Sequence, residues 1–308
     1  MNKNIGVVFV VILSAFFWGS NFNVASLVVN PISPVFAASE RFFIATIFIF
    51  LVLIIKGQCG LSTIRKDIFA IAVLGLIGIT GLNVAFFIGM RSTSPMNGAL
   101  IMATSPMTTA LLNALLDKRR VPYINMVGMA ISFIGVALVI SDGKIVNLAR
   151  MNFRSGDQLM MFANLSMAIY TVGCKRFIKT ATPLQISSFT MLSGTIGIII
   201  FTLLYPTEPQ PFSAISLQSH VLLAYMGIAG SVLAYLFWNI GINRLGVPVT
   251  SIFFNFVPIF TMLISLCQGA SLNMMQLNGT ILVVAGVLIT TQSARIINGM
   301  RYAFQRSH

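Results

Sequence analysis

A set of polar and aromatic side chains lies inside the long apolar runs of this sequence, where few chemical groups are available. We take them as candidates for substrate binding: Trp18, Asn21, Asn83, Phe86, Phe87, Met102, Tyr170, Tyr235, Trp238, Asn239, Phe254 and Asn255. Amides and phenols form hydrogen bonds, and aromatic faces attract an ammonium group by about 0.5–2 kcal/mol. The set suits a small substrate with polar and apolar parts, such as an amino acid. Ordinary packing of the aromatic rings and hydrogen bonds between helices remain alternative explanations.

Glu40 and Arg41 are the two charged residues that lie well inside an apolar run. Charged groups in such positions are costly, so they usually face a partner or a water-filled cavity. One prediction is that Glu40 carries a proton, or that the pair gates one mouth of a pathway. The alternative is that both side chains bond to neighbouring helices and only hold them together.

The sequence lacks the groupings that enzymes and metal sites need. His220 lies near a run end and His308 at the carboxyl terminus, while Cys59, Cys174 and Cys267 are scattered without metal-ligand spacing. No zinc-protease motif, nucleophile–base pair or nucleotide-binding glycine loop occurs. We therefore predict that the protein is not an enzyme, has no catalytic residue, and needs no metal or cofactor.

The composition indicates which elements must position these residues. Hydrophobic residues make up 57% of the 308 positions and charged residues 8%, whereas soluble domains carry about 25% charged residues. The apolar runs are about 20 residues long, as bilayer-spanning helices are, and they do not alternate as barrel strands do. The net charge of +13 falls between these runs, as in membrane loops, so nucleic-acid binding is not expected.

The sequence predicts ten spanning helices joined mostly by short loops. They are expected at residues 5–28, 34–55, 68–90, 95–116, 122–141, 157–175, 183–204, 217–240, 247–268 and 273–293. No interval is long enough for a soluble domain. The fold class is therefore an all-α integral membrane protein.

The basic residues predict the orientation of these helices. Most Lys and Arg fall at the end that would be cytoplasmic if both termini are inside, including Lys118, Lys175 and Arg176. The opposite end receives Arg91, Lys144, Arg150 and Arg154. This bias predicts a multi-pass protein of the inner membrane with cytoplasmic amino and carboxyl termini. Residues 296–308 would form a basic tail against anionic lipid.

The chain also resembles itself at an offset of about 152 residues. The matched pairs include Gly75 with Gly227, Gly78 with Gly230, Pro106 with Pro258, and Trp18 with Tyr170. Residues 1–144 and 145–295 would then be two five-helix repeats. Because five is odd, the second repeat must enter the membrane from the opposite side. Inverted repeats are common in secondary transporters, whose substrate site lies where the two halves meet. An ancient duplication in a membrane enzyme or scaffold is the alternative.

Several stretches resemble the drug/metabolite transporter superfamily, in its ten-span branch with two EamA domains. They are "FFWGSNF" at 16–22, "ERFFIATIFIFLVL" at 40–53, "GMRSTSPMNGALIMATSPMTTALL" at 89–112, "GMAISFIGVALVI" at 128–140 and "AYLFWNIGINRLGVPVTSIFFNFVPIFTML" at 234–263. The resemblance implies a central cavity lined by the first, third, fourth, sixth, eighth and ninth helices. It also implies that the fifth and tenth helices lie at the back, at a possible homodimer contact.

The expected function is secondary transport by alternating access, most simply export of small metabolites such as amino acids or related compounds, with the proton as a candidate coupling ion. Export of drugs, a channel and a membrane enzyme are the alternatives. The related small multidrug exporters bind cations with a glutamate in the first helix, and this first helix has no acid. We expect Pro106 and Pro258 to kink the fourth and ninth helices and to act as hinges. The protein would work as a monomer or a homodimer.

Overall fold

The structure is a computed structural model that describes residues 2–30, 32–60, 64–118, 121–140, 155–204, 215–269, 274–275, 277–286 and 288–289. Within these residues the chain is helical and has no strand. Seven helices are long and apolar enough to cross a membrane, and two shorter apolar helices cover Tyr123–Gly135 and Leu277–Gly286. The prediction of an all-α integral membrane fold is confirmed.

The first half contains five helical passes, three of them continuous and two interrupted. They are α1 (Asn2–Val28), α2 (Pro34–Ile55), the third pass α4 (Ile68–Gly75), η1 (Leu76–Gly81) and α5 (Leu82–Gly89), the fourth pass α6 (Pro95–Met102) and α7 (Ser105–Leu116), and α8 (Tyr123–Ile140). The predicted boundaries at Pro34 and Pro95 agree because proline is favoured in the first turn of a helix.

The second half repeats this order. It has α10 (Ser155–Phe177), α11 (Pro183–Leu204), the eighth pass α12 (Leu217–Gly227), η3 (Ile228–Leu233) and α13 (Ala234–Arg244), the ninth pass α14 (Val247–Ile252), η4 (Phe253–Asn255) and α15 (Phe256–Cys267), and the helix Leu277–Gly286. The eighth pass continues to Arg244, beyond the predicted end at 240. The predicted charges at 144, 150 and 154, and the tail at 296–308, lie outside the described residues.

α10 is long enough to span a membrane but is not among the seven strongly apolar helices. It carries polar residues such as Asp157, Asn164 and Thr171, and α5, α6 and α7 pack against it. Asn164 and Thr171 lie on the buried side of α10, whereas its exposed side carries Met161, Phe162 and Leu165. Polar residues of a membrane helix are tolerated where they face other helices.

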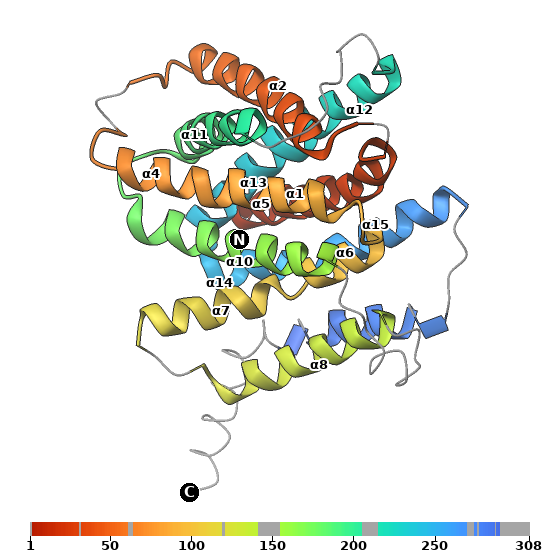
Figure 1. Cartoon of the computed structure of the whole chain (residues 1–308). Helices are drawn as coiled ribbons and strands as arrows, with labels where there is room; N and C mark the ends of the chain where they lie inside the picture. The colour runs from red at the N-terminus through yellow and green to blue at the C-terminus, as the bar shows by residue number, and fades with distance from the viewer. Residues whose placement is uncertain are drawn as a thin grey trace, which may run out of the picture.

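The two halves interlock by exchanging partners. α1 packs against α13 and α15, and in the same way α10 packs against α5 and α7. α2 packs against α11, and Figure 1 shows this pair at the top of the bundle. In Figure 1, α8 lies beside the blue helix of residues 277–286 at the bottom edge, away from α2 and α11. Each first helix of one half therefore completes the core of the other half.

Paired glycines allow the closest helix crossings. A Cβ atom on Gly135 would collide with the Gly279 carbonyl, and a Cβ atom on Gly286 would collide with the Gly128 carbonyl. Ser132 Oγ also donates a hydrogen bond of 3.2 Å to the Val283 carbonyl. Small residues let backbones approach in this way in membrane helices. They fix the fifth and tenth helices against each other.

The loops at the two ends of the bundle form two separate groups. At one end Arg176 forms an ion pair of 2.6 Å with Asp117, and Asp67 bonds the backbone of residues 179–181. At the other end Arg91 Nε donates to the Val29 carbonyl, and Thr93 donates to Asp157. We call the first group the lysine end, because it also carries Lys56, Lys175 and Lys179. Val29 and residues 179–181 follow the first helix of each half, and they lie at opposite ends of the bundle. An odd number of passes per repeat requires this arrangement.

Candidate functional site

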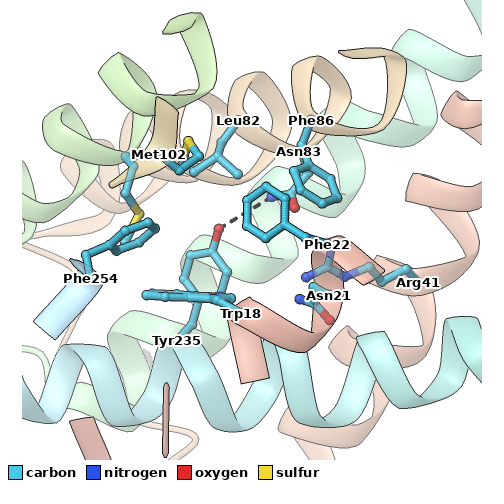
Figure 2. Close-up of a pocket in the computed structure, with 11 residues that line it drawn as sticks. Trp18, Asn21, Phe22, Arg41, Leu82, Asn83, Phe86, Met102, Tyr235 and Phe254 are labelled. Atoms are coloured by element: carbon cyan, nitrogen blue, oxygen red, sulfur yellow. Dashed lines mark hydrogen bonds between the residues drawn. The ribbon is translucent and has the colours of Figure 1, made fainter. Parts of the chain in front are cut away.

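A cavity of about 40 Å³ lies where the two halves meet. Eleven residues line it: Trp18, Asn21, Phe22, Arg41, Leu82, Asn83, Phe86, Met102, Met167, Tyr235 and Phe254 (Figure 2). They come from α1, α2, α5 and α6 of the first half and from α10, α13 and η4 of the second. A water molecule needs about 10–15 Å³ measured in the same way. The cavity therefore has room for a few water molecules.

Two short π-helical segments bond residues that line this cavity. η1 and η3 occupy equivalent positions in the two halves and contain the matched glycines Gly78 and Gly230. A π-helical turn leaves backbone carbonyls available to other partners, and such turns are frequent at functional sites. The carbonyls of Gly78 in η1 and Gly230 in η3 are both used in this way.

The Gly230 carbonyl accepts hydrogen bonds from three side chains of the first half. Trp18 Nε1 donates at 3.1 Å, Arg41 Nη2 at 3.1 Å and Asn21 Nδ2 at 3.5 Å. Glycine is required here because a Cβ atom at position 230 would overlap the amide of Asn21. This contact joins α1, α2 and η3 at one atom.

The Gly78 carbonyl is held from the second half. Tyr235 Oη donates to it at 3.1 Å and also accepts from Asn83 Nδ2 at 3.4 Å. Asn83 Nδ2 is itself 2.9 Å from the Ile79 carbonyl. Tyr235 and Asn83 therefore have two roles: they donate hydrogen bonds to backbone carbonyls of η1, and they line the cavity.

Arg41 is the one charged residue among those that line the cavity, and 2% of it is exposed. Besides the Gly230 carbonyl it donates from Nε to Ser231 Oγ at 2.9 Å. Its guanidinium lies 5.0 Å from the ring centre of Phe42 and 5.7 Å from that of Phe87. The effective cost of burying one such ion without a counter-ion is several kcal/mol. Because burial of the Arg41 charge lowers stability, we expect this charge to have a role in function.

An aromatic layer lies between the cavity and the lysine end. Trp18 lies 5.0 Å from Trp238 and 5.2 Å from Phe254, and Tyr170 lies 5.5 Å from Tyr235, between ring centres. Trp238 Nε1 donates to Thr171 Oγ1 at 3.1 Å.

Of the twelve predicted binding residues, the structure brings seven to the cavity: Trp18, Asn21, Asn83, Phe86, Met102, Tyr235 and Phe254. The other five, Phe87, Tyr170, Trp238, Asn239 and Asn255, are buried outside its lining. Asn239 donates to Tyr170 Oη at 2.8 Å and to Ser187 Oγ at 2.9 Å. Trp238 and Tyr170 thus belong to the layer behind the cavity wall.

Four lining residues were not predicted as binding residues: Phe22, Arg41, Leu82 and Met167. Phe22 follows Trp18 by four residues, and Met167 precedes Tyr170 by three. Helical spacing therefore places both on faces that the sequence had already indicated. Leu82 has no comparable signal, because it is one of many leucines in apolar runs.

Glu40 points away from Arg41 and pairs with another helix. Its Oε1 lies 2.6 Å from Nδ1 of His220 at the start of α12, and both side chains are mostly buried. The sequence treated His220 as a residue near water and did not pair it with Glu40. The pair of Glu40 and His220 lies toward the end of the bundle opposite the lysine end. Glu40 directly precedes Arg41 on α2.

The fourth and ninth passes are both broken at equivalent places. α6 ends at Met102 and α7 starts at Ser105, while α14 and α15 are separated by η4. Pro106 and Pro258 lie in the first turns after these breaks and cannot donate to the carbonyls four residues earlier. Asn164 supports the first break by donating to the Ile101 carbonyl at 2.8 Å. Both passes are therefore interrupted beside Pro106 and Pro258, and the role of these prolines as hinges stays a prediction.

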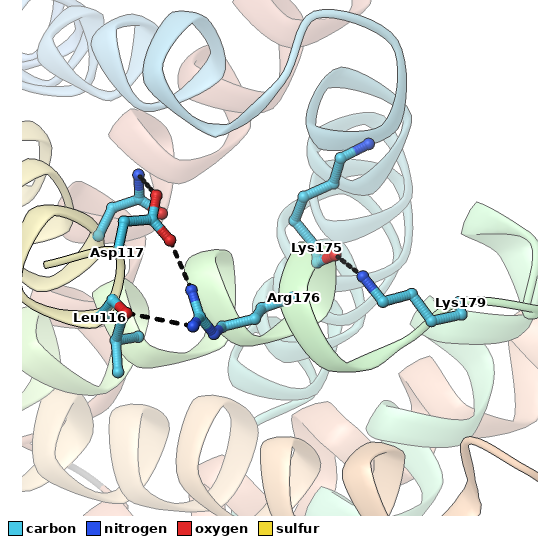
Figure 3. Close-up of polar contacts among 6 residues, drawn as sticks. Leu116, Asp117, Lys175, Arg176 and Lys179 are labelled. Carbon is cyan, nitrogen blue, oxygen red and sulfur yellow. Dashed lines mark hydrogen bonds and ion pairs between the residues drawn. The ribbon is translucent and has the colours of Figure 1, made fainter. Parts of the chain in front are cut away.

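A second cavity of about 180 Å³ opens at the lysine end. Lys175 and Lys179 lie at its rim, and Cys174 and Asn239 lie among its walls. Lys179 Nζ donates to the Lys175 carbonyl, and the neighbouring Arg176 is neutralised by Asp117 (Figure 3). Because Asn239 bonds Tyr170, whose ring contacts Tyr235, one layer of side chains separates the two cavities.

The described residues contain no group of three or more His, Cys, Asp or Glu side chains that could hold a metal ion. The side chains around the two cavities offer hydrogen bonds, aromatic faces and positive charge.

Comparisons with known proteins agree with this architecture. Residues 5–141 and 154–292 each match the EamA-like transporter family. The uncharacterized transporter YyaM of Bacillus subtilis is 36% identical over 294 residues, covering 96% of both chains. An uncharacterized transporter of Archaeoglobus fulgidus is 26% identical, covering 92% of this chain and 98% of its own.

Two further comparisons are more distant. The S-adenosylmethionine/S-adenosylhomocysteine transporter of Chlamydia trachomatis is 24% identical over 164 residues, 53% of this chain and 50% of its own. A solved crystal structure matches with a TM-score of 0.71 at 16% identity and covers 95% of this chain and 98% of its own. That structural match concerns the fold alone.

Proposed function

Because the chain belongs to the EamA-like transporter family, we propose that it is a secondary transporter that exports small metabolites, such as amino acids or related compounds, across the inner membrane. Its termini would be cytoplasmic, so the lysine end faces the cytoplasm. The proposal holds for a monomer or a homodimer, since one chain forms the whole cavity.

The observation that carries the proposal is the central cavity between two inverted halves. Its walls combine a cation, two amides and a phenol with aromatic and thioether side chains. This lining suits a substrate that has a charged or polar group on a small apolar body. Sites at the interface of inverted repeats are typical of secondary transporters.

The small size of this cavity supports alternating access. Sites for small organic molecules measure about 300–1,000 Å³, far more than the cavity of about 40 Å³ between the two halves. We propose that this is an occluded arrangement, in which the aromatic layer separates the site from the lysine end. Substrate would enter when the two halves rock apart.

The distant relative from Chlamydia supports the amino-acid class. Its name gives S-adenosylmethionine and S-adenosylhomocysteine as substrates, and both compounds carry an α-amino-acid group. Export of cationic drugs is less well supported, because the cavity lining contains Arg41 and no carboxylate. Export of other toxic compounds remains the alternative that a wider substrate panel would test.

The test is counterflow in proteoliposomes. Vesicles loaded with one unlabelled amino acid or metabolite at a time are given the same labelled compound outside, with and without a pH gradient. A carrier accumulates label transiently and saturates, whereas a channel does neither. Absence of saturable counterflow for every compound would refute the proposal. Leu51→Ala, a change at an exposed apolar site, is the matched control.

A further inference from the structure

We infer that Arg41 binds the carboxylate group of the transported substrate, so that the central cavity selects carboxylates over the corresponding amides and amines. The inference rests on the proposed function, because it assigns a substrate class to the same cavity. Four observations support it: an unbalanced buried charge, unused donors, the equivalent position in the second half, and the charge of the second cavity.

The first observation is that no carboxylate in the described part of the chain pairs with Arg41. Each of these carboxylates bonds elsewhere: Glu40 with His220, Asp67 with the backbone of residues 179–181, Asp117 with Arg176, and Asp157 with Thr93. Arg41 is nevertheless buried in the centre of the bundle. A buried cation is stabilised by an anion, and the substrate site is the space that it faces.

The second observation concerns the donors of the guanidinium. Arg41 has five N–H groups, and its two hydrogen bonds to described residues use Nε and one position of Nη2. Figure 2 shows the guanidinium beside the amide of Asn21 at the cavity wall. Asn21 Oδ1 is also buried and has no partner among the described residues. A carboxylate at Arg41 and an ammonium at Asn21 would fit an α-amino acid.

The third observation is that packing alone does not require a charge here. α2 and α11 occupy equivalent places, and both begin with proline. An added Cβ atom at Gly227 would press on the Arg41 carbonyl, and one at Gly75 would press on the Thr190 carbonyl. Thr190 is therefore the counterpart of Arg41, and it fills the same packing position with a neutral side chain.

The fourth observation is the positive rim of the second cavity. Lys175 and Lys179 are exposed there, and neither forms an ion pair with a described carboxylate. A cleft lined by one sign of charge concentrates ligands of the opposite sign. An anion that enters from the lysine end would pass this rim and the aromatic layer before it reaches Arg41. Positive side chains would therefore lie at the beginning and at the end of its path.

A single guanidinium also limits the type of anion. It matches the single charge of a carboxylate, whereas a phosphate monoester carries about −1.5 to −2 at neutral pH. The remaining walls include Leu82, Phe86, Met102 and Phe254, which favour an apolar substituent. The substrate class is therefore a monocarboxylate with an apolar tail, with or without an amino group.

The test uses the two tryptophans of the chain: Trp18, which lines the cavity, and Trp238, which lies behind the cavity wall with its ring 5.0 Å from that of Trp18. Their emission reports binding without requiring transport. Protein in nanodiscs is titrated with an isobutyl series, leucine, 4-methylpentanoate, leucinamide and isopentylamine, and with the corresponding benzyl series. We expect saturable changes with the carboxylates and at least tenfold weaker binding of the amides and amines. Equal binding of acid and amide, or no binding of any carboxylate, overturns the inference.

Two variants of Arg41 separate binding from positioning. Arg41→Lys should keep the preference for carboxylates with weaker affinity, and Arg41→Gln should lose the preference, so that acid and amide bind alike. Thermal unfolding of each variant shows whether it folds. If Arg41→Gln is folded and still prefers carboxylates, or if Arg41→Lys loses binding of acid and amide equally, the inference fails. Saturable counterflow without charge preference in the wild type would leave the transporter proposal intact.

The rim is tested separately. Lys175→Gln combined with Lys179→Gln should raise the KM for carboxylate counterflow about two- to fivefold at low ionic strength, and the effect should shrink at high salt because exposed charges are screened. Lys56→Gln, at an exposed lysine of the same end outside the cavity rim, is the matched control. An equal effect of the control, or no effect of the double variant at low salt, contradicts the role of the rim.

Discussion

Glu40 and Arg41 are neighbours in sequence but have different surroundings. Glu40 contacts His220 on α12, while Arg41 reaches the Gly230 carbonyl at the cavity. Adjacent helical residues point about 100° apart, so one can face a cavity and the next a neighbouring helix. From the sequence we predicted either that Glu40 carries a proton or that the pair acts together as a gate, and the geometry separates a candidate proton site from a candidate substrate site.

The proton role of Glu40 leads to the first prediction. Glu40→Gln removes the ionisable partner of His220, so pH-driven flux should fall at least tenfold while counterflow without a gradient persists. Flux in proteoliposomes under both conditions measures this. Asp157→Asn, at a carboxylate of the same end that bonds Thr93, should retain pH-driven flux. Unchanged pH-driven flux in Glu40→Gln would exclude the carboxyl as the coupling group.

Asp67 illustrates a residue whose structural role is clear. Its carboxylate accepts hydrogen bonds from Thr180 Oγ1 at 2.6 Å and from the Thr180 and Ala181 amides at 2.7 and 3.1 Å. Burial tends to raise the pKa of Asp67, but the hydrogen bonds from Thr180, Lys179 and Ala181 outweigh it and hold the pKa below its ordinary value. The ionised group therefore clamps two loops of the lysine end.

The second prediction follows from this lowered pKa. The stabilisation is complete above the ordinary aspartate pKa and is lost as pH falls through the lowered one. Asp67→Asn should cost about 1.5–3 kcal/mol at pH 7, and its difference from wild type should shrink in strong acid. Thermal unfolding in detergent across this range measures it. Asp117→Asn, at a half-exposed ion pair, should cost about 1 kcal/mol or less.

At the scale of helices, the sequence predicted most boundaries because proline, glycine and charged residues mark them. It could not predict the π-helical turns η1 and η3. The glycine spacing at 75, 78 and 227, 230 indicated close contacts, but a change of hydrogen-bond register depends on partners such as Tyr235 and Trp18. Those partners lie in the other half of the chain, so no local pattern reveals them.

The paired helix breaks lead to the third prediction. Pro106→Ala with Pro258→Ala restores two N–H groups, which could bond the Met102 and Phe254 carbonyls and repair both breaks. At about 1 kcal/mol for each of the two bonds, we expect counterflow to slow roughly thirtyfold, with equal or higher thermal stability. Pro34→Ala is the control, since Pro34 begins α2 after a loop and no helix directly before it could be joined to α2. An unchanged counterflow rate would show that the breaks are not hinges.

At the scale of the whole molecule, the repeat in the sequence predicted the inverted architecture, and the exchange of α1 and α10 between halves gives its physical basis. The cavity was predicted less completely. Side chains such as Phe87 and Asn255 have suitable chemistry and depth, but they face neighbouring helices instead. Which face of a helix meets the cavity depends on the crossing of all the helices, and a linear pattern does not contain that information.

The fourth prediction concerns the two ends of the bundle. In a background with Cys59, Cys174 and Cys267 changed to serine, single cysteines at Lys118 and Lys175 should react with an impermeant thiol reagent only from the cytoplasmic side. A cysteine at Arg91 should react only from the opposite side. Labelling of intact cells and of inverted vesicles measures this. Reaction of positions 118 and 175 from opposite sides would contradict the inverted repeat.

The three donors at the Gly230 carbonyl outnumber the two lone pairs of that oxygen. If one donor turns toward an arriving anion, the oxygen is still fully satisfied by the other two. Loading the site therefore leaves no orphaned backbone group in the interior of the membrane, and the helices can remain intact while a side chain changes partners. Because one donor is in excess, a side chain can leave the Gly230 carbonyl to bind substrate without a change in the backbone hydrogen bonds.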